Sequence, residues 1–172
     1  MQGCNTSGAD EAFERTPLHW AAWSGAVRIG EMLIDQGADM EADDLQSFTP
    51  MHLAAERGQS AFIALLLTRG ASTNARSTNG NTPIHYAANN NQAAAASKLL
   101  TAMHDKHPTN NEGLSPADIA QAKGHVGLAR SLEAARGAAP KPEWHRPAFL
   151  GALPAPRRAL AENDLARLPT LA

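Results

Sequence analysis

Residues 16–22 read Thr-Pro-Leu-His-Trp-Ala-Ala, and two later stretches, residues 49–55 and 82–88, follow nearly the same pattern. A fourth, degenerate copy begins at Ser115 and reads Ser-Pro-Ala-Asp-Ile-Ala. The first residues of successive copies lie 33 positions apart. Self-similarity at one fixed period predicts a repeat architecture, in which each repeat is a small unit that stacks on its neighbours to form a core.

The residue types in this stretch are those expected at the start of a helix. Thr and Ser are favoured N-caps, because the side-chain oxygen accepts a hydrogen bond from a free helix amide. Proline suits the first helical position, where its missing N–H costs nothing. Leu18, Met51 and Ile84 then supply an apolar contact in each copy, and the small alanine pairs let neighbouring helices approach closely.

The period of 33 residues and the Thr-Pro-Leu-His-x-Ala-Ala opening resemble the ankyrin repeat family over about residues 16–136. The resemblance implies an all-α solenoid of stacked helix-turn-helix repeats with β-hairpin-like fingers, plus a Pro-rich C-terminal tail. It also implies that the recurrent His19, His52 and His85 form structural hydrogen bonds. A metal or general-base role is the alternative, but one histidine per repeat would form a ladder and would not converge on one ion.

The repeat period divides the chain into segments. A lead-in at residues 1–15 is followed by four repeats at residues 16–48, 49–81, 82–114 and 115–136, of which the third is divergent and the fourth is a C-terminal cap. The tail at residues 137–172 holds six of the eleven prolines. For the tail, an extended chain, a short helix around residues 158–168 and packing of Trp144 onto the stack stay open. The first repeat lacks an obvious polar N-terminal cap, so a fragment of a longer ankyrin protein is also an open interpretation.

Repeat three departs from the pattern. Asn91 stands where the family has glycine between helices, and four alanines at residues 93–96 replace large aliphatic side chains. We expect an outer helix over about residues 92–103, one turn longer than usual, and an altered finger after it. Because each lost large side chain removes about 1.5–3 kcal/mol of burial, this repeat is expected to be the weakest joint.

By analogy with the family, a partner protein binds the concave face that fingers and inner helices line. Trp23, Leu45 and Phe48 would be large apolar groups on one exposed stretch, which favours an interface. The alternative is that Trp23 packs on Phe13 or Phe48 and seals the N-terminal end. Trp20 is expected in the core between inner helices. The candidate partner-binding residues are Trp23, Asp43, Asp44, Leu45, Gln46, Phe48, Glu56, Arg57, Thr78, Asn79, Asn81, Asn89 and Asn90.

Charge varies along the repeats. Repeat one has a net charge of −5, repeat two a net charge of +2, and the chain from Ser115 onward a net charge of +3. Such a gradient orients a charged partner and raises its association rate. We therefore expect a partner that presents a basic segment to the finger at residues 39–44 and an apolar residue to Trp23 and Phe48. For any single charged residue, a role in keeping the protein soluble is an equally good explanation.

Composition bounds the class of protein. The net charge of −2 and the absence of a basic stripe argue against nucleic acid as a partner, and no apolar run approaches the length of a membrane span. Cys4 is the single cysteine, so no internal disulfide forms, which fits a reducing compartment. The first seven residues do not form a secretory signal. We expect an intracellular monomer, in the cytoplasm, the nucleus or both.

No catalytic motif is present: the chain has no P-loop, no Gly-x-Ser-x-Gly and no His-Glu-x-x-His. His104, Asp105 and His107 come closest to a metal cluster, but a fourth ligand is missing, so neither a metal nor a cofactor is expected. The sequence predicts a non-catalytic protein-binding module that acts as a scaffold, adaptor or competitive inhibitor. The alternative is a regulatory or targeting subunit whose repeats hold one protein while the tail at residues 137–172 recruits another.

Overall fold

The structure is a computed structural model that describes residues 8–105, 108–135 and 137. The chain divides into two compact units, Met1–Gly137 and Ala138–Ala172, and every described residue belongs to the first. The expected features of the tail, including the helix around residues 158–168, lie outside the described residues.

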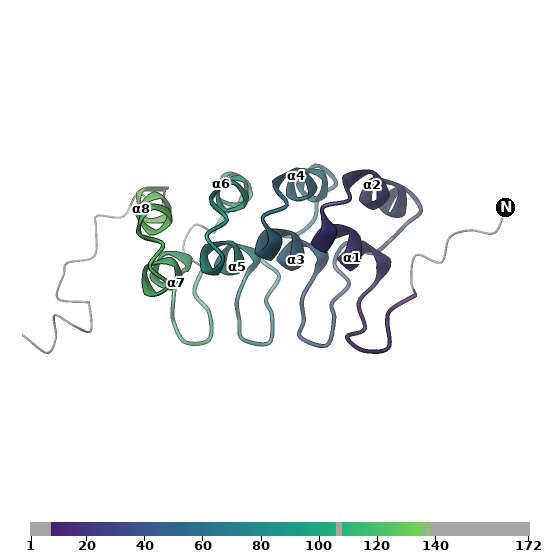
Figure 1. Ribbon diagram of the computed structural model, residues 1–172, viewed down its shortest axis with the longest axis horizontal. Helices are drawn as coiled ribbons and strands as arrows, with labels where there is room; N and C mark the ends of the chain where they lie inside the picture. Colours follow the sequence, from purple (N-terminus) through teal and green to yellow (C-terminus); the bar gives the residue numbers. More distant parts are fainter. Residues whose placement is uncertain (1–7, 106–107, 136, 138–172) are drawn as a thin grey trace, which may run out of the picture. The chain divides into compact units, whose positions relative to one another are not determined.

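Eight α-helices and no strand make up the regular secondary structure of the described part of the chain, which confirms the all-α solenoid. The helices alternate between an inner and an outer layer (Figure 1). A long loop, the finger, projects beyond the inner layer between one repeat and the next. The inner helices are α1 (Pro17–Ser24), α3 (Pro50–Arg57), α5 (Pro83–Asn89) and α7 (Pro116–Ala122). The outer helices are α2 (Val27–Asp35), α4 (Ser60–Thr68), α6 (Ala93–Ala102) and α8 (Val126–Ala135).

Each inner helix begins as the repeated stretch predicts. Thr16, Thr49, Thr82 and Ser115 are the N-caps, each with an extended backbone, and the proline that follows is the first helical residue. The fixed φ of proline suits that position, and the cap residue can then satisfy a free amide of the first turn. The same local chemistry therefore starts the inner helix in all four repeats.

Residues with positive φ separate the two helices of each repeat. Gly25, Gly58 and Gly124 have φ values of 74°, 72° and 82° at this turn. Asn91 occupies the corresponding place in repeat three with a φ of 57°. Asparagine is one of the few residues with a side chain that adopts this left-handed conformation readily. The substitution of glycine by asparagine in repeat three therefore preserves the turn.

The core lies between successive repeats and between the two layers. Leu18, Met51 and Ile84 are buried, as are both alanines of the pair that follows them in α1, α3 and α5. In the outer layer, α4 buries Phe62, Ile63 and Leu66, whereas α6 buries two alanines and Leu99. The helix α6 has 10 residues against 9 in α4, so the expectation of an additional turn was wrong.

Candidate protein-binding surface

One buried histidine in each of the first three repeats links an inner helix to the next finger. The backbone N–H of Thr16 donates to His19 Nδ1 at 3.1 Å, so the ring proton resides on Nε2. His19 Nε2 then donates to the carbonyl oxygen of Phe48, 29 residues further on, at 2.7 Å. His52 and His85 repeat the arrangement, with Nε2 at 3.1 Å from the carbonyl oxygens of Asn81 and Leu114.

Burial keeps these rings neutral. Desolvation lowers the pKa of His52 and of His85 to about 4, although the hydrogen bonds to backbone carbonyls oppose the shift. The pKa of His19 is also lowered, mainly by desolvation. Both ring nitrogens of each histidine are engaged in hydrogen bonds, which is the structural role expected for them. Within the described residues, no three His, Cys, Asp or Glu side chains gather as metal ligands.

Repeat four replaces this histidine with an acid. The Asp118 carboxylate accepts the backbone N–H of Ser115 at 2.9 Å and its hydroxyl at 2.6 Å, so the start of α7 is still capped. A carboxylate has no proton to donate to the carbonyl of a following finger. Repeat four therefore keeps the capping half of the arrangement, and the side chain at this position cannot make the donor half.

The first finger is built around Asp44. Its side chain is 1% exposed and forms an ion pair with Arg15 at 3.0 Å between Nε and Oδ2. Its other oxygen accepts the backbone N–H groups of Gln46 and Phe48 at 2.8 and 3.0 Å. Asp44 was a candidate contact for a basic partner, but the structure places its carboxylate inside the finger, where it holds the turn. The neighbouring Asp43 is exposed.

Phe48 also differs from its expected place on an exposed apolar stretch. The residue is only partly exposed, and its ring stacks on the His52 ring with centroids 5.6 Å apart. The same ring meets the edge of Tyr86 at 4.8 Å. Phe48 therefore packs between repeats, and Leu45, at 59% exposure, is the large apolar side chain that the first finger presents to solvent.

Trp20 and Trp23 form an exposed aromatic pair on α1. Their ring centroids lie 6.1 Å apart at 73°, and the two residues are 42% and 38% exposed. The expectation that Trp20 lies in the core was therefore wrong. The Trp20 indole N–H donates to the Asp10 carboxylate at 3.0 Å, and the guanidinium of Arg57 lies 4.5 Å above the Trp23 ring. The ring contact of Trp23 is thus with Trp20, whereas the alternative had expected packing on Phe13 or Phe48.

Arg15 joins the aromatic pair to the first finger. Its guanidinium carbon lies 5.6 Å from the Trp20 ring centroid and 4.9 Å from that of Phe13, while its Nε binds Asp44. Sequence reasoning assigned no such role to Phe13, which is 47% exposed. A hydrophobic residue in a short polar lead-in next to an arginine was a usable signal for this cation–π contact.

Hydrogen bonds join the fingers to one another. The Thr78 N–H donates to the carbonyl of Gln46 at 3.1 Å, and the Asn111 N–H donates to the carbonyl of Asn79 at 3.1 Å. The Asn110 side-chain amide donates to the Asn81 side chain at 3.0 Å. Each of these fingers is therefore held against the next one by hydrogen bonds.

The structure sorts the candidate binding residues by accessibility. The exposed members are Trp23, Asp43, Leu45, Gln46, Arg57, Thr78, Asn79 and Asn90. The partly exposed members are Phe48, Glu56, Asn81 and Asn89, and the buried member is Asp44. Arg15 connects helix α1 to the first finger, because it contacts both Trp20 and Asp44. We give the name repeat-one surface to the exposed residues on the two sides of this connection, together with Arg57, which lies over Trp23. They are Trp20, Trp23, Arg57, Asp43, Leu45 and Gln46.

Comparison with known proteins supports the repeat assignment. A family model described as ankyrin repeats, in three copies, matches residues 2–77 and 51–141 of the chain. No curated protein matches the chain. Among the described helices, none is both long enough and apolar enough to cross a bilayer.

Proposed function

The chain belongs to the ankyrin-repeat family, and from that premise we propose that it is a non-catalytic module that binds a partner protein along its finger tips and inner-helix ends. The repeat-one surface is the proposed centre of this concave binding face. The observation that carries the proposal is the exposed Trp20–Trp23 pair, since tryptophan is enriched among the residues that dominate binding energy.

The chemistry of the repeat-one surface defines the partner. Trp23 and Leu45 offer apolar contacts, and the exposed Asp43 adds negative charge at the finger. A matching segment carries an apolar residue and one or more basic side chains. Such a segment is steered to the acidic first repeat and is held by the aromatic groups once docked. Scaffold, adaptor and competitive inhibitor are all roles that this mode of binding serves.

Affinity capture from an extract of the native cell tests the proposal. The bait is compared with a Trp23→Ala/Leu45→Ala double variant and with a Val126→Ala control, which removes an exposed apolar side chain from α8. A partner bound at the repeat-one surface is retained by the control and weakened at least about tenfold in the double variant. All three baits must first show equal circular dichroism and melting temperatures. Equal capture by all three would contradict the proposal.

A separate variant tests the electrostatic contribution of the first finger to partner binding. Asp43→Lys reverses an exposed charge, whereas Asp44 is avoided because its loss would leave Arg15 without its carboxylate. We expect the affinity of Asp43→Lys to fall at low ionic strength and to approach that of the wild type as salt screens the charge. An affinity that is insensitive to both the substitution and salt would remove the electrostatic part of the proposal.

A second role, a regulatory or targeting subunit, assigns a separate partner to the tail, which holds six of the eleven prolines. Truncation after residue 137 distinguishes the two roles, because only a tail-dependent partner is then lost from the capture. The single cysteine suits a reducing compartment, so the proposal places the protein in the cytoplasm or the nucleus, as a monomer without affinity for nucleic acid.

A further inference from the structure

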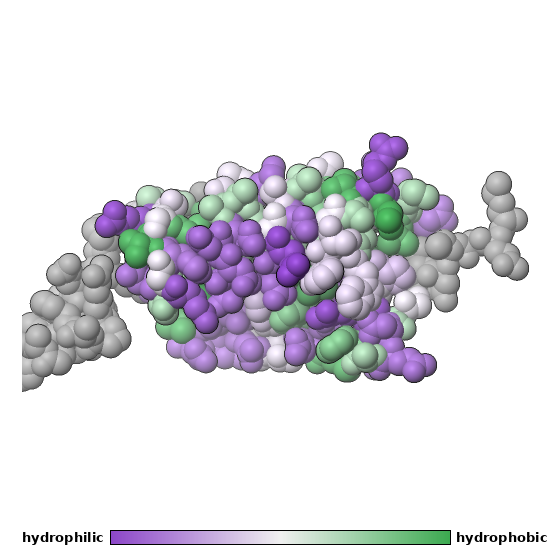
Figure 2. All heavy atoms as spheres, in the orientation of Figure 1, coloured by the Kyte–Doolittle hydropathy of each residue, from purple (hydrophilic) through white to green (hydrophobic). Residues whose placement is uncertain are grey.

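Arg57 has a positive charge that no described carboxylate pairs with. It is the last residue of α3 and is exposed, and the surface over α3 and α5 is largely hydrophilic on the face that Figure 2 shows. Arg15 and Arg69 both form ion pairs, whereas Arg57 forms none within the described part of the chain. Glu56 precedes it on α3, but adjacent residues of a helix do not face each other. The charge of Arg57 is therefore available to a partner.

Trp23 holds the side chain of Arg57 in place. The guanidinium carbon lies over the Trp23 ring, 4.5 Å from its centroid. A guanidinium has five N–H donors, and contact with a ring face leaves most of them free to bind an acceptor. A long side chain loses rotamer freedom when a partner binds it, and a side chain that is already held loses less. Arg57 is thus a preorganised donor.

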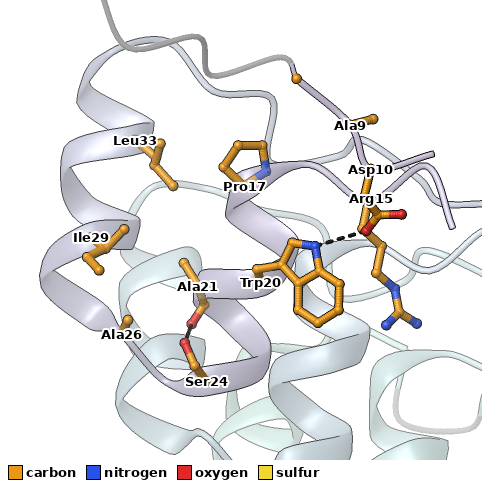
Figure 3. Close-up of a pocket in the computed structure, with 11 residues that line it drawn as sticks. Ala9, Asp10, Arg15, Pro17, Trp20, Ala21, Ser24, Ala26, Ile29 and Leu33 are labelled. Atoms are coloured by element: carbon orange, nitrogen blue, oxygen red, sulfur yellow. Dashed lines mark hydrogen bonds between the residues drawn. The ribbon is translucent and has the colours of Figure 1, made fainter. Parts of the chain in front are cut away.

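The aromatic residues beneath Arg57 are fixed in turn. The ring of Trp23 meets that of Trp20, with the centroids 6.1 Å apart. Trp20 donates its indole N–H to the Asp10 carboxylate at 3.0 Å, and the Arg15 side chain extends beside the Trp20 ring (Figure 3). Trp20 also borders a cavity of about 600 Å³ between α1, α2 and the lead-in. A row of contacts therefore runs from Arg57 across both indoles to Arg15 and the first finger.

The two ends of this row have opposite charge. Arg57 is positive at the helix end. At the finger end, Asp44 is paired with Arg15, but Asp43 beside it is exposed and forms no ion pair with another described residue. The two indoles lie between Arg57 and the finger. A segment that binds the whole row therefore needs side chains of both signs with an apolar side chain between them.

A carboxylate suits Arg57 better than a phosphate does. Both groups can accept two parallel N–H bonds from one guanidinium. A phosphorylated side chain brings a charge of about −1.5 to −2 at neutral pH, whereas a carboxylate brings a single charge. Arg57 is a single cation with Glu56 next to it in the sequence and Asp43 at the other end of the row. It therefore balances one negative charge and not two.

Building on the proposed function, we propose that Arg57 is a specificity-determining residue of the repeat-one surface, where it binds a carboxylate of the partner protein. The carboxylate lies next to the apolar residue that packs on Trp23, and the basic residue of the same segment lies at Asp43. The partner is then a segment of mixed charge, with its acid at the helix end and its base at the finger. The order of these three contacts fixes how the segment lies on the repeats.

Selection from a library of random peptides displayed on phage identifies the preferred segment. The bait is the full chain, and peptides that also bind the Trp23→Ala/Leu45→Ala double variant are first removed. We expect the remaining peptides to carry Asp or Glu at a fixed spacing from a large apolar residue. Synthetic copies of these peptides are then titrated with variants of the chain, and fluorescence anisotropy measures the affinity.

The variants separate recognition of a carboxylate from a general effect of charge. Arg57→Gln weakens peptide binding at least about tenfold, because the carboxylate loses its charged donor. The matched control Arg28→Gln removes an exposed arginine from α2 and leaves the affinity unchanged. Replacing the acid of the peptide with lysine weakens binding to the wild type by a similar factor, and Arg57→Glu restores part of that loss. A purely structural Arg57 would give no such recovery.

The outcomes separate the role of Arg57 from the proposed function. If no peptide prefers the wild type to the double variant, the repeat-one surface is not a binding site, and both proposals fail. If peptides prefer the wild type but carry no acid, or bind Arg57→Gln and Arg28→Gln equally well, the surface binds a partner without recognition by Arg57. Tighter binding after the acid is replaced with phosphoserine would make phosphate the preferred group and would overturn the assignment of a carboxylate.

Discussion

At the scale of single residues, the histidines show how one side chain serves two elements. His52 receives the Thr49 N–H on Nδ1 and donates from Nε2 to the carbonyl of Asn81 in the next finger. Only the neutral ring can do both, since an imidazolium has no acceptor nitrogen. Local helix capping and the linkage between repeats therefore depend on the same protonation state.

This dependence predicts a loss of stability in mild acid. A histidine whose pKa falls from 6.5 in the unfolded chain to about 4 in the fold stabilises the fold fully above pH 6.5 and less as the pH falls toward 4. Between pH 7 and pH 5, we expect His52 and His85 each to reduce the free energy of unfolding by about 2 kcal/mol. Urea unfolding across that range measures it. His52→Gln should flatten the slope, and a stability independent of pH would contradict the expectation.

At the scale of helices, α4 and α6 have the same place in successive repeats but different cores. The fully buried side chains of α4 are Phe62, Ile63 and Leu66, while those of α6 are Ala95, Ala96 and Leu99. Alanine favours the helix itself but buries less apolar surface against its neighbours. Helix α6 is therefore well formed locally and weakly held by packing.

Hydrogen exchange distinguishes these two contributions. We expect the amides of α6, residues 93–102, to exchange faster than those of α4, residues 60–68, because local opening follows the weakest packing. Mass spectrometry of peptic fragments resolves the two helices in one sample, so each serves as the reference for the other. Equal protection of α4 and α6 would show that the alanine-rich core is no weaker.

At the scale of the whole stack, equivalent positions of successive 33-residue repeats have different environments. Phe62 and Leu53 have a preceding repeat against them, whereas Ile29 and Trp20 face the cavity at the end of the described stack. Stability in a repeat array is a sum of repeat and interface terms, so the cost of a substitution depends on which neighbours exist.

Alanine substitutions in the first and second repeats check this dependence. Phe62→Ala and Leu53→Ala should lower the free energy of unfolding by about 2–5 kcal/mol, because each leaves a cavity in the core. Ile29→Ala should cost less than about 1 kcal/mol, as expected at a largely exposed site. Chemical denaturation with matched m-values provides the comparison. A cost at Ile29 equal to that at Phe62 would mean that another part of the chain covers Ile29.

Sequence reasoning failed at the residues near the end of the array. The periodic pattern assigns Trp20 to the core because it treats every repeat as an interior one, yet the described stack has no repeat before α1. It likewise treated Asp44 as a free charge, although Arg15 and two backbone amides hold its carboxylate inside the finger. Periodicity describes what a position is suited to, and it does not report which neighbour is present.

The sequence by itself determined the period, the helix starts and the turns, because N-caps, prolines and left-handed glycines act on the backbone within a few residues of themselves. It also determined the family and the role of the histidines. Only the tertiary structure decided which polar and apolar side chains remain accessible. Asp44 is buried and Phe48 is partly buried, whereas Trp20, Ile29 and Met32 are exposed. The reason is that the accessibility of a side chain depends on contacts between residues far apart in the chain and on which faces another repeat covers.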